Sequence, residues 1–166
     1  MPTFKQLSDL TGRTALVTGA VGGLGKIFSD TLGELGANLI LVDLPGKSLD
    51  IFAKELKSKW GTNVHFFEIN LEVEADRQSL ITKIKKDFDQ LNILINNAAF
   101  VGYSDLTGWN TDFENQSLES WRRAFEVNLT AVFELCQGFT PLMKKSVGAS
   151  IINISSIYGQ LGPDWP

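Results

Sequence analysis

The sequence predicts an α/β fold in which helices cover both faces of a parallel sheet, a doubly wound arrangement. Strand-like apolar runs alternate with segments of helical periodicity, which is the pattern of repeated β–α–β units. A glycine-rich turn joins the first strand-like run to the first helical segment. The 166 residues are 43% hydrophobic, enough for one globular core, so residues 1–166 form a single predicted domain.

The expected elements follow one another in regular order. Strands are predicted at residues 14–17, 37–43, 64–69, 91–95 and 150–154. The helix after the first strand has a predicted apolar face of Ile27, Phe28, Thr31 and Leu32. The helix after the second strand is predicted to bury Leu49, Phe52, Ala53 and Leu56. The helix after the third strand is predicted to bury Leu80, Ile81 and Ile84. A long helix is expected at about residues 118–145, with an apolar stripe predicted to be core: Trp121, Phe125, Leu129, Val132 and Phe133.

Composition and charge exclude several classes of protein. Fifteen Lys and Arg against nineteen Asp and Glu give a net charge of -4 with the signs interspersed, so a nucleic-acid partner is not expected. There is no apolar signal core or membrane-length run, which predicts a cytoplasmic protein with no membrane partner. The single Cys136 is interpreted as a buried structural thiol and the single His65 as structural. No cluster has metal-ligand spacing, so no metal is expected.

The glycine-rich turn of residues 18–25 indicates a binding site for a cofactor phosphate. Glycines between a strand and a helix let the backbone approach a pyrophosphate, and the helix N-terminus offers unpaired N–H groups. Gly19, Gly23 and Gly25 have this position. A glycine-rich turn without a ligand is the alternative interpretation.

Asp43 stands eighteen residues after Gly25, at the end of the second predicted strand. A carboxylate there is placed to accept hydrogen bonds from the hydroxyls of an adenosine ribose. It would also repel a 2′-phosphate. The alternative is that Asp43 only caps a turn ahead of Pro45.

With these elements in place, the chain resembles the short-chain dehydrogenase/reductase family from about Leu10 to its last residue. Four motifs carry the resemblance: the Thr-Gly-x-x-x-Gly-x-Gly turn from Thr18, the segment Asn96-Asn97-Ala98-Ala99, Asn128 within a helix, and Asn153-Ile154-Ser155-Ser156. It implies a Rossmann-like fold. It also implies an oxidoreductase that transfers hydride between a nicotinamide cofactor and a small carbonyl or alcohol substrate.

The resemblance also implies which residues bind the cofactor. These are Gly19, Val21, Gly23, Leu24, Gly25, Asp43, Leu44, Asn70, Leu71, Asn97, Ala98 and Ala99. Asn70 replaces the more usual aspartate and would accept from the adenine amino group through its side-chain carbonyl. NAD is favoured over NADP, because Gly22 and Leu44 stand where a cation for the 2′-phosphate would be expected, although Lys47 leaves NADP open.

Asn128 and Ser156 are the expected catalytic residues. Asn is a poor residue within a helix, which suggests a specific role for Asn128. In the family this Asn bends the helix and holds a water of the proton relay; a satisfied buried amide is the alternative. Ser156 would donate a hydrogen bond to the substrate carbonyl oxygen as charge develops there.

The sequence departs from the family at the general base, which is a tyrosine followed one helical turn later by lysine. Thr107 follows Tyr103 at that spacing and Gly162 follows Tyr158, so neither tyrosine fits. We therefore expect the N-terminal part of a longer, homo-oligomeric enzyme, with the doubly wound sheet truncated after the fifth strand and that strand left as an exposed edge. The alternative is a non-catalytic dinucleotide-binding module or an inactive fragment.

Overall fold

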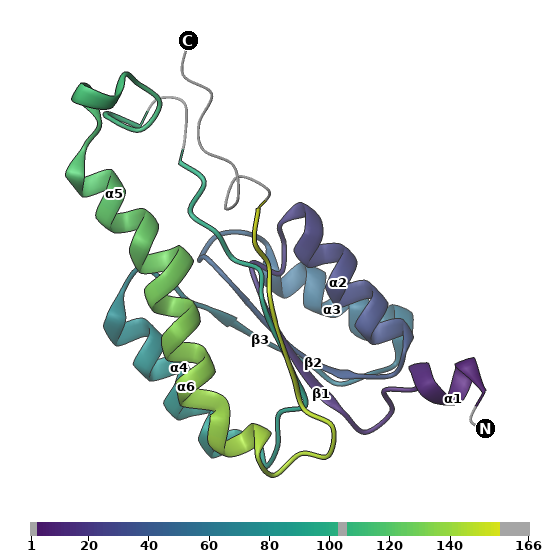
Figure 1. The fold of residues 1–166 in the computed structure, drawn as a ribbon. Coiled ribbons are helices and arrows are strands. Elements are labelled where there is room, and N and C mark those ends of the chain that lie inside the picture. Colours follow the sequence, from purple (N-terminus) through teal and green to yellow (C-terminus); the bar gives the residue numbers. More distant parts are fainter. Residues whose placement is uncertain (1–2, 103–105, 157–166) are drawn as a thin grey trace.

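The computed structural model describes residues 3–102 and 106–156 and contains one five-stranded parallel sheet. Figure 1 shows this sheet running through the middle of the molecule. Its strand order is β3-β2-β1-β4-β5. The order reverses between β1 and β4, which makes this position the topological switch point of the sheet. The strands are β1 Thr14–Thr18, β2 Asn38–Asp43, β3 Val64–Glu68, β4 Ile93–Asn96 and β5 Ser150–Asn153.

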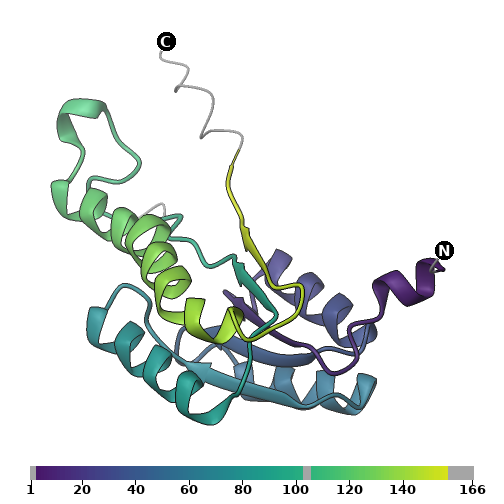
Figure 2. The same ribbon diagram turned by 60° about the horizontal axis from the view of Figure 1, so that its bottom comes forward.

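Helices cover the two faces of the sheet in pairs, as Figures 1 and 2 show. Helices α2 (Gly23–Glu34) and α3 (Leu49–Trp60) lie on one face, and α4 (Glu74–Asp87) and α6 (Ala131–Met143) lie on the other. The remaining elements are α1 (Phe4–Ser8), the 3₁₀ helix η1 (Phe113–Asn115), α5 (Leu118–Phe125) and the π-helix η2 (Glu126–Thr130). The doubly wound α/β fold is thereby confirmed.

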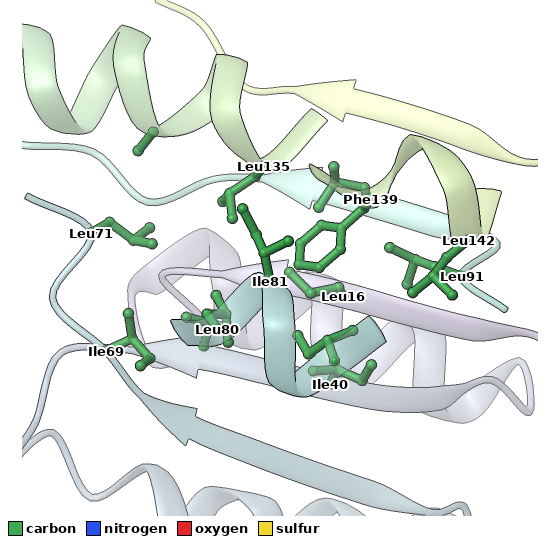
Figure 3. Close-up of a cluster of buried hydrophobic side chains, with 14 of the residues drawn as sticks. Leu16, Ile40, Ile69, Leu71, Leu80, Ile81, Leu91, Leu135, Phe139 and Leu142 are labelled. Carbon is green, nitrogen blue, oxygen red and sulfur yellow. The ribbon is translucent and has the colours of Figure 1, made fainter. Parts of the chain in front are cut away.

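Alternating strand residues supply the two halves of the core. Leu16 and Ile40 point to the face covered by α4 and α6, where they join Ile81, Leu135 and Phe139 (Figure 3). The residues between them along the strands point to the face covered by α2 and α3: Ala15, Val17, Leu39 and Leu41. Because both faces are buried, β1, β2 and β4 are continuous apolar runs, as expected for the middle of a parallel sheet.

The predicted element boundaries agree with the structure to within two residues, except in the long helix. The segment expected as one helix at about 118–145 is divided into α5, η2 and α6. Asn128 lies at the centre of η2. A π-turn inserts a residue into the helical hydrogen-bond ladder and is frequent at functional sites.

The prediction that the apolar stripe on the long helix is core was wrong for four of its five residues, and the fifth, Val132, is half-buried. Trp121 is 57% exposed, Leu129 is 55% exposed and Phe133 is 65% exposed. The helix instead buries a second apolar face, which includes Leu135 and Phe139. Helical periodicity identifies apolar faces, but only packing decides which one meets the sheet.

The predicted apolar face of α2 is also partly wrong. Ile27 is 61% exposed and Thr31 is exposed, whereas Leu32 is buried as expected. The buried face of α2 consists of small residues together with that leucine: Gly25, Ser29, Leu32 and Gly33. Small residues allow a close approach, since a Cβ on Gly33 would lie 2.8 Å from the Trp60 ring.

The inward positions predicted for α3 and α4 are confirmed in large part. Leu49, Ala53 and Leu56 are buried and Phe52 is half-buried. Leu80, Ile81 and Ile84 are buried on α4. Cys136 is half-buried against the core, whereas His65 is exposed on β3 with its ring against that of Phe88.

Strand β5 is an edge of the sheet, as expected. Among the described residues it pairs with β4 alone, through matched positions such as Ile95 and Ile152. Ile151 and Ile152 are each 43% exposed. In residues 3–102 and 106–156 no helix is long and apolar enough to cross a membrane, and no group of three or more His, Cys, Asp and Glu is placed to hold a metal ion.

Candidate functional site

A cavity of about 620 Å³ lies where the carboxyl ends of β1, β2, β3 and β4 meet, at the switch point of the sheet. Its volume falls within the usual range for small-molecule sites. It collects all the predicted cofactor-binding residues except Gly25: Gly19, Val21, Gly23, Leu24, Asp43, Leu44, Asn70, Leu71, Asn97, Ala98 and Ala99. Segments far apart in the sequence therefore meet around one space.

The glycine turn needs its glycines for two different reasons. Gly19 has a φ of +64°, and a Cβ there would lie 2.9 Å from Cα of Ala98. Gly25 is buried beneath the turn, where a Cβ would overlap the carbonyl oxygen of Gly19. Gly23 has open space around its Cα. Gly19 and Gly25 thus allow the turn to close, while Gly23 leaves the cavity wall without a side chain.

The N-terminus of α2 opens into this cavity. Its N-cap residue, Gly22, makes no side-chain cap, and the backbone N–H of Lys26 donates to the Gly22 carbonyl at 3.0 Å. The N–H groups of the first helical turn precede that bond and have no partner within the helix. Together with the helix dipole, these donors suit an anionic group such as a pyrophosphate.

Asp43 links the end of β2 to the glycine turn. Its carboxylate accepts from the backbone N–H of Val21 and from that of Leu44, both at 2.8 Å. Each carboxylate oxygen keeps a further acceptor position. Asp43 is therefore held in one orientation at the cavity wall, with capacity to accept from ligand hydroxyls.

The ends of β1 and β4 are joined by side chains. Asn97 Nδ2 donates to the carbonyl oxygens of Thr18 and Gly19, at 3.0 and 3.1 Å. The Thr18 hydroxyl accepts from the backbone N–H groups of Asn97 and Ala98, each at 3.0 Å. Asn97, predicted to bind the cofactor, therefore also joins the ends of these two strands, together with Thr18 of the glycine motif.

Asn70 uses its side-chain carbonyl locally. That oxygen accepts from the backbone N–H of Glu72 at 3.0 Å, which forms a turn directly after β3. The backbone N–H of Asn70 donates to Asp76 Oδ2 at 3.2 Å. The Asn70 side-chain oxygen, which was expected to accept from the adenine amino group, therefore already accepts one hydrogen bond from the protein backbone.

Asn128 anchors the segment that follows β4. Its Oδ1 accepts from the backbone N–H of Phe100 at 2.7 Å, and its Nδ2 donates to the Phe100 carbonyl at 3.1 Å. Phe100 lines the cavity, as does Val127, the neighbour of Asn128. Asn128 thus interrupts the helix at η2 and fastens the cavity wall.

The expected catalytic residues lie outside the described lining of the cavity. Ser156 is exposed, three residues beyond the end of β5. Neither Ser156 nor Asn128 is among the described lining residues. Tyr103 and Tyr158 lie outside the described residues.

Sequence reasoning missed a group of lining residues that gather around Arg123. This residue reaches the cavity from α5, and its Nε and Nη2 donate to the two carboxylate oxygens of Glu72 at 2.7 and 3.2 Å. The guanidinium carbon lies 4.9 Å from the centre of the Phe100 ring. No local pattern signals these contacts, because Glu72 and Arg123 are 51 residues apart.

A buried cation supports this side of the cavity. The guanidinium of Arg77, which is 1% exposed, donates to the carbonyl of the lining residue Leu71 at 2.8 Å. It also forms ion pairs with Glu134 of α6 at 2.8 Å and with Glu126 of η2 at 3.1 Å. Its hydrogen bonds hold the pKa of Glu134 below the usual value of 4.5. Arg77 therefore fixes the loop after β3 relative to the π-helix.

Both the sequence and the fold are similar to those of known proteins. Residues 13–165 match the family model described as short chain dehydrogenase. The chain belongs to this family. The predicted resemblance is thereby confirmed.

Individual short-chain dehydrogenase relatives show the same likeness. The chain is 38% identical over 157 residues to nodulation protein G of Rhizobium sp. (strain N33), covering 93% of this chain and 58% of that protein. It is 31% identical over 153 residues to the 3-oxoacyl-[acyl-carrier-protein] reductase FabG of Aquifex aeolicus, covering 92% and 59%. The chain thus spans well under two thirds of the length of these curated relatives.

A solved structure shares the fold. The short chain dehydrogenase of Escherichia coli CFT073, complexed with NADPH, superposes with a TM-score of 0.82 at 28% identity. The match covers 94% of this chain and 64% of that one. Family membership and fold therefore agree.

Proposed function

We propose that this chain forms the cofactor-binding part of an oxidoreductase that transfers hydride between a nicotinamide dinucleotide and a carbonyl or alcohol. The observation that carries the proposal is the cavity at the switch point, where the glycine turn, Asp43 and Asn97 meet. The first turn of α2 would receive the pyrophosphate, and Asp43 the adenosine ribose. The nicotinamide, when bound, supplies or accepts the hydride.

The proposed cofactor is NAD. Asp43 is held by two backbone N–H groups. In the proposed binding mode its carboxylate would face the adenosine ribose and repel a 2′-phosphate. The E. coli relative is complexed with NADPH, which favours NADP as the second candidate. Lys47 also lines the cavity and, within residues 3–102 and 106–156, forms no ion pair, so it is the cation available to a 2′-phosphate.

Substitutions at Asp43 and Lys47 test the choice of cofactor. Asp43→Ala should weaken NADH binding by about 1.5–3 kcal/mol, because hydrogen bonds to a charged group are lost, and should relax discrimination against NADPH. Titration calorimetry with both cofactors measures the change. Lys47→Ala is the matched substitution. If Lys47→Ala loses NADPH binding while Asp43→Ala keeps the NADH binding of the unmodified chain, the chain is assigned to NADP.

Ser156 and Asn128 are the proposed catalytic residues of the whole enzyme. The Ser156 hydroxyl would donate to the substrate oxygen as negative charge develops, which lowers the barrier more than it stabilises the ground state. From its position in the π-helix η2, Asn128 would hold a water molecule that takes part in proton transfer. In the full-length enzyme, Ser156→Ala should therefore lower kcat while leaving cofactor affinity nearly intact.

A non-catalytic dinucleotide-binding module is the second candidate function. It is favoured by the sequence, since neither Tyr103 nor Tyr158 is followed by lysine at the spacing of the family base. Titration of NADH into the full-length protein, together with a hydride-transfer assay on a panel of ketones, separates the two. Binding without turnover supports the module, and turnover excludes it.

A further inference from the structure

The π-helix η2 begins at a residue that makes two kinds of contact. The backbone carbonyl of Glu126 accepts a hydrogen bond from the backbone N–H of Ala131, five residues later, and this spacing is what makes the turn π-helical. The carboxylate of the same Glu126 forms an ion pair with Arg77 of α4 at 3.1 Å. Asn128 lies between the two residues that the backbone bond joins. The ion pair therefore acts on the residue at which the turn around Asn128 starts.

Arg77 is fixed before it reaches the π-helix. Its side chain is 2% exposed, and its guanidinium donates to the carbonyl of Leu71 and to the carboxylate of Glu134, both at 2.8 Å. Removing a partner from a buried ion pair is strongly destabilising, so the guanidinium has one strongly preferred position. The Glu126 side chain, by contrast, is 43% exposed and can be hydrated in other orientations. The position of this ion pair is therefore set by Arg77, and Glu126 follows it.

The π-turn is held by contacts outside its own helix. Such turns are rare, which indicates that they depend on their surroundings. Asn128 joins η2 to the backbone of Phe100, in the segment after β4. Glu126 joins η2 to Arg77, which in turn holds the carbonyl of Leu71 in the loop after β3. Since Phe100 and Leu71 both line the cavity, η2 is held against two of its walls.

We propose that Arg77 and Glu126 are positioning residues for Asn128: through their ion pair, α4 sets the place of the π-helix and with it the place of the Asn128 side chain. The catalytic consequence of this inference rests on the proposed function, in which Asn128 takes part in proton transfer. The inference separates the two carboxylates that Arg77 binds. Glu126 serves the site, whereas Glu134 on α6 serves the stability of the fold.

Substitutions at the two partners of Arg77 test the inference in the full-length protein. Glu126→Ala should lower kcat about tenfold and leave the Kd for NADH nearly unchanged, because a misplaced Asn128 affects the chemical step. Glu134→Ala should lower kcat by less than about threefold. It should lower the Tm more than Glu126→Ala does, because the Glu134 side chain is only 18% exposed and also accepts from Gln78. Glu126→Gln keeps an acceptor for the guanidinium and should recover part of kcat.

Hydrogen exchange gives a second measurement that does not need turnover. The backbone N–H of Phe100 donates to Asn128 Oδ1 at 2.7 Å, whereas that of Ala98, in the same segment, donates to a threonine hydroxyl of β1 at 3.0 Å. Glu126→Ala should speed exchange at Phe100 about tenfold more than at Ala98, since only the first amide depends on Asn128. Glu134→Ala should change both amides by the same factor, through overall stability.

Asp30→Asn is the matched control. It removes a carboxylate from an ion pair between two helices, with Lys59 at 2.9 Å, outside the cavity lining. It should keep the original kcat and the original ratio of exchange rates at Phe100 and Ala98.

The two measurements separate failure of the inference from failure of the proposed function. An equal loss of kcat in Glu126→Ala and Glu134→Ala, or exchange at Phe100 that follows Ala98 in Glu126→Ala, would overturn the inference. Absence of hydride transfer by the unmodified full-length protein would instead refute the proposed function, and the exchange rates would then decide the inference alone.

Discussion

At the scale of single residues, the two glycines at the start of α2 have separable roles. Gly25 lies against the carbonyl of Gly19, with no room for a Cβ, whereas Gly23 has open space on the cavity side. One glycine thus serves the fold of the turn, and the other keeps the wall of the proposed phosphate site free. Glycine is therefore required at the two positions of the motif for two different physical reasons.

Alanine at each position should separate these roles. Gly25→Ala should lower the free energy of unfolding by about 3 kcal/mol or more, because the backbone must move to accept the methyl group. Gly23→Ala should leave stability unchanged or raise it by up to about 1 kcal/mol, while weakening NADH binding. Urea unfolding and NADH titration measure the two effects; equal loss of stability in both variants would contradict this assignment.

Asn128 should contribute to stability apart from any catalytic role. Asn128→Ala removes both hydrogen bonds to the Phe100 backbone, which should cost about 1–2 kcal/mol in the free energy of unfolding. Hydrogen exchange at the Phe100 amide should become faster, since its acceptor is gone. Unchanged exchange would mean that the segment after β4 is held by other contacts.

At the scale of elements, the ion-pair network of Arg77 joins α4 to η2 and α6. Glu134 has a lowered pKa because it accepts hydrogen bonds from Arg77. A carboxylate with a folded pKa below its unfolded value stabilises the fold above the unfolded value, near 4.5, and loses that contribution as pH falls through the folded pKa. Part of the acid sensitivity of the fold therefore resides in this pair of helices.

Replacing Glu134 should alter the acid limb of the stability curve. Glu134→Gln should lower the unfolding free energy at pH 7 and flatten its decline below about pH 4.5. Thermal unfolding followed by circular dichroism at pH values from about 3 to about 7 gives the dependence of stability on pH. Glu119→Gln removes an exposed carboxylate from α5 and should keep the original slope. Parallel curves for all three proteins would contradict the assignment.

At the scale of the whole molecule, two regions of residues 3–102 and 106–156 expose apolar side chains that could promote association. One is the edge strand β5, and the other is the stripe on α5, η2 and α6 that contains Trp121 and Phe133. Exposed strand edges and contiguous apolar patches both promote association. The chain in this structure is therefore expected to self-associate as its concentration rises.

A charge on the edge strand tests the first surface. Ile152→Lys should lower the weight-average mass seen by sedimentation, because a charged edge resists pairing with another strand. Val147→Lys adds the same charge at an exposed loop position outside β5 and should have little effect. Association that persists equally in both variants would assign it to the helical stripe.

The sequence by itself determined the order of the elements, the glycine turn and the position of Asp43. These depend on local periodicity and on spacing within one β–α–β unit, which a linear pattern records. The same pattern placed Asn97 and Asn128 at segments that the fold brings to the cavity wall or to its support.

Only the tertiary structure decided which helix faces are buried and which distant side chains meet. The stripe of Phe133 and the inner face of Phe139 are both apolar, and the choice between them was made by packing against the sheet. The pairing of Glu72 with Arg123 likewise has no trace in local sequence, because it forms between a strand-end loop and a helix. Such contacts depend on the geometry of the assembled layers, which no spacing along the chain encodes.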